Sequence, residues 1–121
     1  MDSVTHTLQT LAPQLAAWRR DFHQYAESGW VEFRTAAKVA EILDALGFEL
    51  AMGRDVVDAE SRMGLPDEQT LAQEFARARQ QGAPEKWLSA FEGGFTGIVA
   101  TLNTGRPGPT LAFRVDMDAL D

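Results

Sequence analysis

The sequence contains no cysteine, which excludes disulfide bonds, thiol nucleophiles and cysteine-ligated metal sites within this chain. Histidine is scarce as well, since only His6 and His23 occur. A hydrolytic metal centre commonly takes about three protein ligands. Any metal chemistry must therefore use carboxylates of this chain or residues outside it.

Long apolar runs are also missing, because no stretch approaches the roughly 20 residues that cross a bilayer. The amino-terminal residues lack the basic region and apolar core of a secretory signal. Basic residues are few: 11 Lys and Arg against 18 Asp and Glu give a net charge of −7. This charge disfavours phosphate backbones and anionic membrane surfaces. We therefore expect a cytoplasmic protein with neither a nucleic-acid nor a membrane partner.

In two stretches apolar residues recur at steps of three and four, the spacing of a buried helical stripe. Pro13 suits a first helical turn, so we expect the first helix to begin near it and to end between residues 25 and 28. In the second stretch, Thr35 is the expected N-cap and Gly47 the left-handed residue after the helix. The two stripes consist of Leu8, Leu11, Leu15, Trp18 and Phe22, and of Ala36, Val39, Ala40, Leu43 and Leu46.

Three segments have the composition of strands: 48–52, 97–102 and 110–115. The last two are separated by a linker rich in Gly and Pro, which favours an antiparallel pair. The continuous apolar run 111–113 predicts a strand buried on both faces. Helices and strands in this order predict an α/β fold, with helices packed on a partial mixed sheet.

A charge-rich block at residues 53–96 interrupts this pattern and is predicted to be an inserted helical excursion. A helix is expected to open at Leu65-Pro66-Asp67, to bury Leu71, Phe75 and Ala78, and to close at Gly82. A short turn after Pro84 carries Trp87, Leu88 and Phe91. These large apolar residues predict that the block packs on the rest of the protein.

Two acids separated by one residue, Asp116 and Asp118, follow the last predicted strand. Catalytic groups gather at strand ends in open α/β sheets, where two carboxylates repel each other, raise one pKa or recruit a cation. The simpler alternative is a solvated strand end in which Arg114 pairs with an acid. His23 and Glu27 are four residues apart and are expected on one helical face. They could share a metal, or the carboxylate of Glu27 could simply hold the histidine in place.

Residues 18–29, with Glu32 and Thr35, resemble the opening signature of the M20 metallopeptidase/amidohydrolase family. Residues 114–120 resemble the first active-site motif of its amidohydrolase branch. The resemblance implies that residues 1–121 are the N-terminal portion of a three-layer, zinc-peptidase-like α/β catalytic domain. The rest of that domain and a dimerisation domain would lie outside them, and a homologous second subunit or a homo-oligomer is expected.

The same resemblance implies a hydrolase, dependent on manganese or zinc, that cuts the amide bond of a small N-acyl-glutamate. Residues 25–35 and 91–97 resemble members that split p-aminobenzoyl-glutamate, a folate breakdown product, into p-aminobenzoate and glutamate. Asp118 takes the position of a carboxylate that orients a metal ligand. Asp116 takes the position of a histidine ligand in related peptidases, and its contact with the metal is left open. The remaining ligands and the general base belong to later motifs, so we expect the chain alone to bind no metal and to be inactive.

Two other functions stay open at this point. One is a broader N-acyl-amino-acid amidohydrolase. The other is a non-catalytic remnant or association module, suggested by an unpaired sheet edge and by the cluster of Trp87, Leu88 and Phe91.

Overall fold

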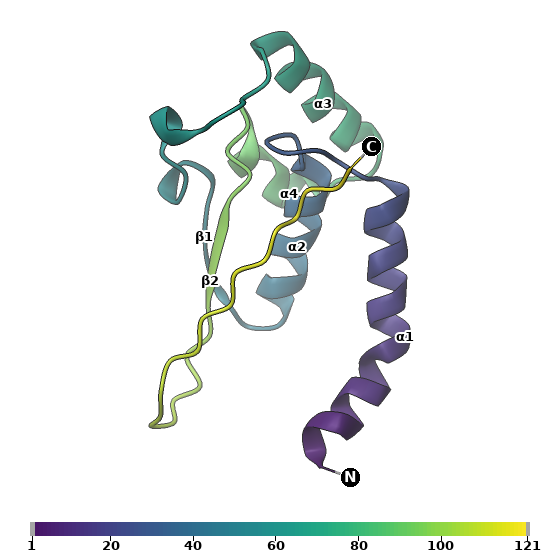
Figure 1. Ribbon diagram of the computed structural model, residues 1–121, viewed down its shortest axis with the longest axis vertical. Helices are drawn as coiled ribbons and strands as arrows, with labels where there is room; N and C mark the ends of the chain where they lie inside the picture. The colour runs from purple at the N-terminus through teal and green to yellow at the C-terminus, as the bar shows by residue number, and fades with distance from the viewer. Residues whose placement is uncertain (1, 121) are drawn as a thin grey trace.

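Helices and two short strands make up the regular structure of residues 2–120, the part of the chain that the computed structural model describes. Figure 1 shows the helices grouped beside a narrow ribbon of sheet. The chain therefore has a mixed α/β fold. In order, the elements are α1 (Ser3–Gln24), α2 (Phe33–Ala45), β1 (Glu49–Met52), η1 (Gly53–Asp55), η2 (Ala59–Ser61), α3 (Glu68–Gln80), α4 (Glu85–Leu88), η3 (Ser89–Phe91) and β2 (Ile98–Thr101).

The sheet has two antiparallel strands, β1 and β2, with Glu49 opposite Thr101 and Met52 opposite Ile98. The strands predicted at 48–52 and 97–102 are thus confirmed. The predicted strand at 110–115 is wrong: this segment is irregular, and Phe113 is 87% exposed. A strand exists only where a neighbouring strand supplies ladder hydrogen bonds. Within residues 2–120, β2 pairs with β1, and segment 110–115 pairs with neither strand. The sheet is therefore antiparallel rather than mixed.

Helix α1 begins at Ser3 and contains Pro13, so the predicted start near the proline is wrong. The Asp2 carboxylate accepts a hydrogen bond from Thr5 N at 2.8 Å and caps the helix there. The predicted burial of its apolar stripe is also wrong, since no residue of α1 is buried and Leu8 is 55% exposed. Apolar spacing specifies a helical face but not what covers it. Among the described residues, no helix combines the length and hydropathy needed to span a membrane.

Helix α2 ends as the sequence predicts, at a glycine with left-handed backbone. Gly47 has a φ of 91°, and its N–H donates to Asp44 O at 3.0 Å. The next amide, Phe48 N, donates to Leu43 O at 3.1 Å, which completes a Schellman motif. The same arrangement ends α3, where Gly82 has a φ of 86°. Both helix ends are therefore local features readable from the sequence.

The first turn of α2 is capped by a residue that lies outside the helix. Thr35 is not the N-cap, because the helix begins after Glu32 and Thr35 lies in its first turn. The buried Glu27 supplies the missing acceptors: its Oε2 accepts from Arg34 N at 3.0 Å and its Oε1 from Thr35 N at 2.7 Å. The Thr35 hydroxyl also donates to Oε1, at 2.7 Å. Glu27 is thus engaged by α2 rather than by His23, which is exposed.

The hydrophobic core lies between α2, α3 and the α4–η3 turn. The rings of Phe33 and Phe75 meet edge to face, with centroids 5.3 Å apart. The packing predicted for block 53–96 is confirmed, as is the buried face of α3. Leu88 and Phe91 are fully buried, so the predicted exposed association cluster is wrong. Burying a large apolar side chain such as Leu88 or Phe91 stabilises the fold by about 1.5–3 kcal/mol.

Arg34 connects three helices. Its guanidinium binds both carboxylate oxygens of Asp21 on α1, each at 2.9 Å, and its Nε donates to Gln81 O after α3 at 2.9 Å. The guanidinium also lies 4.0 Å from the centre of the Tyr25 ring. The hydrogen bonds from Arg34, and then its positive charge, hold the pKa of Asp21 below its usual value. This ion pair joins the carboxyl end of α1 to the core.

Candidate functional site

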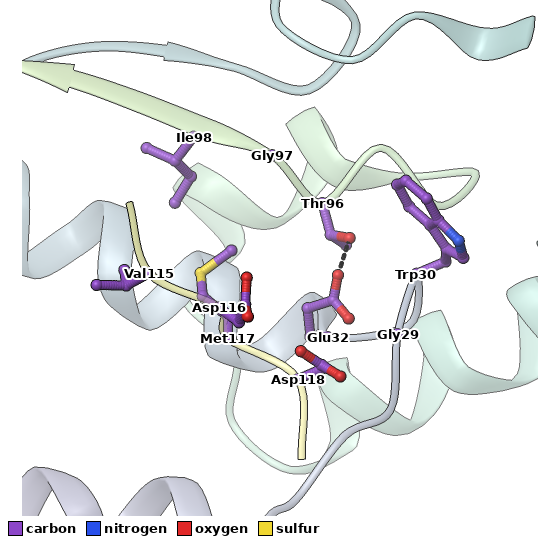
Figure 2. Close-up of a pocket in the computed structure, with 10 residues that line it drawn as sticks. All are labelled: Gly29, Trp30, Glu32, Thr96, Gly97, Ile98, Val115, Asp116, Met117 and Asp118. Carbon is purple, nitrogen blue, oxygen red and sulfur yellow. Dashed lines mark hydrogen bonds between the residues drawn. The ribbon is translucent and has the colours of Figure 1, made fainter. Parts of the chain in front are cut away.

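Segments from the two ends of the chain meet at one open groove of about 400 Å³. Trp30 and Glu32 come from the loop before α2, and Thr96 comes from the residues before β2. Asp116 and Asp118 come from the C-terminal segment, which turns back after β2 and runs toward the end of α1 (Figure 1). The stretches that resemble the M20 opening signature and first active-site motif therefore lie side by side (Figure 2).

The segment that carries the two aspartates is held by its alternate residues. Met117 packs against the hydrophobic core, and Ala119 N donates to Glu27 O at 2.8 Å. Asp116 and Asp118 are exposed on the other side of this extended backbone. The backbone is thus attached to the protein while both carboxylates remain accessible in the groove.

Asp116 forms an ion pair with Arg114 at 3.1 Å, and both side chains are largely exposed. Such a pair contributes about 0–1 kcal/mol. This is the arrangement that the simpler alternative predicts for these residues. The expectation that the aspartates follow a buried strand is wrong, because residues 110–115 are exposed and outside the sheet. Asp118 instead lies beside Glu32 (Figure 2).

Glu32 is the buried acid of the groove, with 7% of the residue exposed. The Thr96 hydroxyl donates a hydrogen bond to its Oε1, whereas Oε2 has no hydrogen-bond partner within residues 2–120. Burial raises the pKa of Glu32, and the nearby charges of Asp118 and Glu27 raise it further. A buried oxygen without a partner is costly and marks a place where another group is expected to bind.

The described residues do not by themselves fit a divalent metal. Within residues 2–120, no three His, Cys, Asp or Glu side chains are grouped so that they could hold an ion. Glu32, Asp116 and Asp118 share the groove without forming a ligand set. Their arrangement can accept hydrogen bonds and orient a neighbouring polar group.

The sequence placed Glu32 in the M20-like signature without giving it a role, and no pattern singled out Thr96 or Trp30. Trp30 is half-exposed, with a left-handed φ of 68°, and its indole N–H donates to Met63 O at 2.7 Å. Such a backbone is rare for residues other than glycine and often occurs at functional sites. Glu32 belongs to the M20-like signature, but no spacing rule links it to Thr96, 64 residues away.

Comparison with known proteins begins with a negative result: no family model matches the chain. Curated relatives do match. The chain is similar to a subunit of p-aminobenzoyl-glutamate hydrolase. Identity to that subunit from Escherichia coli K12 is 70% over the whole chain, which covers 28% of the relative. Identity to the indole-3-acetyl-aspartic acid hydrolase of Enterobacter agglomerans is 73%, with the same coverage.

A solved structure, that of the aminobenzoyl-glutamate utilization protein from Klebsiella pneumoniae, matches with a TM-score of 0.94 and 72% identity. The match covers 99% of this chain and 30% of that one. The chain therefore has the fold of a part of this larger protein. It spans about 28% of the length of the two curated relatives, both of which are named as hydrolases. The Escherichia coli relative is named as one subunit of its enzyme, which implies a second.

Proposed function

We propose that this chain belongs to a metal-dependent amidohydrolase of the M20 type, which cleaves p-aminobenzoyl-glutamate into p-aminobenzoate and glutamate. One observation carries the proposal: the stretches that resemble the M20 signature and active-site motif, far apart in sequence, line one groove. The name of a relative that is 70% identical over the whole chain supports the substrate.

Asp118 is the proposed catalytic-site carboxylate, which orients a metal ligand. Its exposed carboxylate on a backbone held by Met117 and Ala119 suits that task, because a fixed main chain limits where the side chain can reach. For Asp116 we propose no single role, since it pairs with Arg114 and its contact with a metal stays open.

Manganese or zinc belongs to this proposal as the cofactor that activates water in such hydrolases. Because residues 2–120 do not form a metal site, its ligands and the general base are proposed to come from elsewhere in the protein. The same proposal includes a three-layer catalytic domain and a second subunit or a second copy. The cytoplasmic location expected from the sequence stays a prediction.

The test uses the chain extended by its downstream reading frame, called here the extended protein. We expect the extended protein with added manganese to release p-aminobenzoate from p-aminobenzoyl-glutamate. The variant Asp118→Ala is expected to lose most turnover, whereas Glu41→Ala, on the exposed face of α2, is the matched control. A folded, manganese-supplied protein that releases nothing above the blank would contradict the proposal.

A broader N-acyl-amino-acid amidohydrolase is the second candidate. The relative named indole-3-acetyl-aspartic acid hydrolase, at 73% identity, favours it because the substrate in that name has another acyl group and another amino acid. Assays of the extended protein on hippurate, acetylated amino acids and indole-3-acetyl-aspartate separate the two candidates. Comparable kcat/KM values across this panel would favour the broader enzyme.

A non-catalytic association module is the third candidate. Its support is the exposed apolar surface of α1, including Leu8, Leu11 and Leu15, together with Leu111 and Phe113. An extended protein that is inactive on the whole panel but forms a stable complex in sedimentation experiments would favour this function over either hydrolase.

A further inference from the structure

We propose that Glu32 is a positioning residue, whose protonated carboxyl donates a hydrogen bond to Asp118 and fixes that side chain in the groove. The importance of Asp118 for catalysis rests on the proposed function above, whereas the proposed hydrogen bond between Glu32 and Asp118 does not. No spacing pattern in the sequence predicts this pair.

The geometry carries the proposal. Glu32 is buried, and its carboxyl lies between Thr96 and Asp118 (Figure 2). The Thr96 hydroxyl occupies Oε1, so Oε2 is the oxygen left for a second partner. Asp118 borders the same groove and is close enough for its charge to act on Glu32. Oε2 therefore needs a polar partner, and Asp118 is a polar side chain of the same groove.

The charges around Glu32 decide what joins the two carboxyls. Asp118 faces it from the C-terminal segment and Glu27 from the preceding loop, and both are acidic. No Lys or Arg side chain within residues 2–120 lines the groove, whereas Arg34 binds Asp21 and Arg114 pairs with the third groove acid, Asp116. Among residues 2–120, a proton is thus the available positive charge. Burial and these neighbouring acids raise the pKa of Glu32, which favours the protonated form.

A protonated Glu32 would complete the support of Asp118. Met117 and Ala119 hold the main chain on either side of it, but the Asp118 side chain is otherwise exposed. Hydrogen bonds from a carboxylic acid to a carboxylate are short and strong, so one such bond would select a single orientation. Loss of the proton would leave two carboxylates side by side, and their repulsion would release Asp118.

Two substitutions separate this role from a merely structural one. Glu32→Gln keeps an oxygen for Thr96 and offers an N–H₂ donor to Asp118, without a proton that titrates. Glu32→Leu keeps a similar volume and loses both bonds. In the extended protein we expect Glu32→Gln to keep kcat/KM within about threefold of the parent, whereas Glu32→Leu lowers kcat by about 10–100-fold with little change in KM. Glu41→Leu, on the exposed face of α2, is the control.

The pH profile gives a second comparison. The parent protein is expected to lose activity on the alkaline side as Glu32 loses its proton, and Glu32→Gln is expected to lack this fall. If Glu32→Gln is as impaired as Glu32→Leu, an ionised carboxylate is required and the proposal is overturned. Full activity of Glu32→Leu would overturn it as well.

A spectroscopic readout keeps the test independent of activity and of the folding of Glu32→Leu. We expect the infrared spectrum near neutral pH to contain a protonated-carboxyl band that disappears in Glu32→Gln. In Asp118→Ala this band should titrate at lower pH, because a negative charge beside Glu32 is gone. Absence of the band, or a titration unchanged by Asp118→Ala, would refute the pairing. A protein that shows both effects but cleaves no p-aminobenzoyl-glutamate would refute only the proposed function.

Discussion

Replacing Glu27 by alanine is expected to destabilise the protein far more than a surface substitution does. The Glu27 side chain accepts three hydrogen bonds, two from backbone N–H groups in the first turn of α2 and one from the Thr35 hydroxyl. Glu27 is only 1% exposed, so water cannot easily replace its carboxylate. Leaving a buried donor unsatisfied costs about 1–3 kcal/mol. For two backbone donors we expect a loss of about 4 kcal/mol in the free energy of unfolding, a large share of the roughly 5–15 kcal/mol typical of a domain.

Urea unfolding followed by circular dichroism measures this loss. With a denaturant slope of about 2 kcal/mol per molar, the unfolding midpoint should fall by about 2 M in Glu27→Ala. Glu27→Gln keeps one acceptor oxygen but turns an N–H₂ group toward a backbone N–H, so its loss should be intermediate. Glu41→Ala, on the exposed face of the same helix, should change stability by less than about 0.5 kcal/mol. A midpoint for Glu27→Ala equal to that of Glu41→Ala would refute the capping role.

Three further predictions concern charge, catalysis and metal. Arg34 lowers the pKa of Asp21, so the stability that this pair contributes is present above the ordinary pKa of 3.8 and is lost as pH falls through the lowered pKa. The free energy of unfolding, measured against pH, should therefore fall less steeply with acid in Asp21→Asn than in the parent. An equal pH dependence in the two proteins would argue against the pair. In the extended protein, Asp118→Ala should keep the thermal unfolding midpoint while losing most turnover, since its side chain is exposed; an undiminished rate would show that Asp118 has no catalytic role. Elemental analysis of the 121-residue chain alone should find no stoichiometric manganese or zinc, and this chain should release no p-aminobenzoate. Tightly bound, stoichiometric metal would contradict the absence of a ligand set in residues 2–120.

Several features of the fold could be predicted because their causes lie within a few residues of one another. The buried face of α3 follows from the spacing of Leu71, Phe75 and Ala78. The ends of α2 and α3 follow from Gly47 and Gly82, which take left-handed backbone at low cost. The composition of segments 48–52 and 97–102 located β1 and β2, although it did not distinguish them from segment 110–115, which forms no strand.

The errors have a common physical origin in contacts made over long distances along the chain. The apolar face of α1 and the segment 110–115 have the composition of buried elements, but neither contains a buried residue. Thr35 has the chemistry of an N-cap, but the helix begins before it, and the buried Glu27 accepts the hydrogen bond from Thr35 N. Local propensity therefore described what each segment can form, and the neighbours it meets decided the outcome.

The amino-acid order alone was enough to predict an acidic α/β chain, the buried face of α3 and the pair Asp116 and Asp118 as candidate site residues. Only the tertiary structure brought Asp118 beside Glu32, and Glu32 beside Thr96. The reason is that periodicity and turn chemistry act over about four residues, whereas a groove between a loop, a strand start and a returning segment depends on the path of the whole chain.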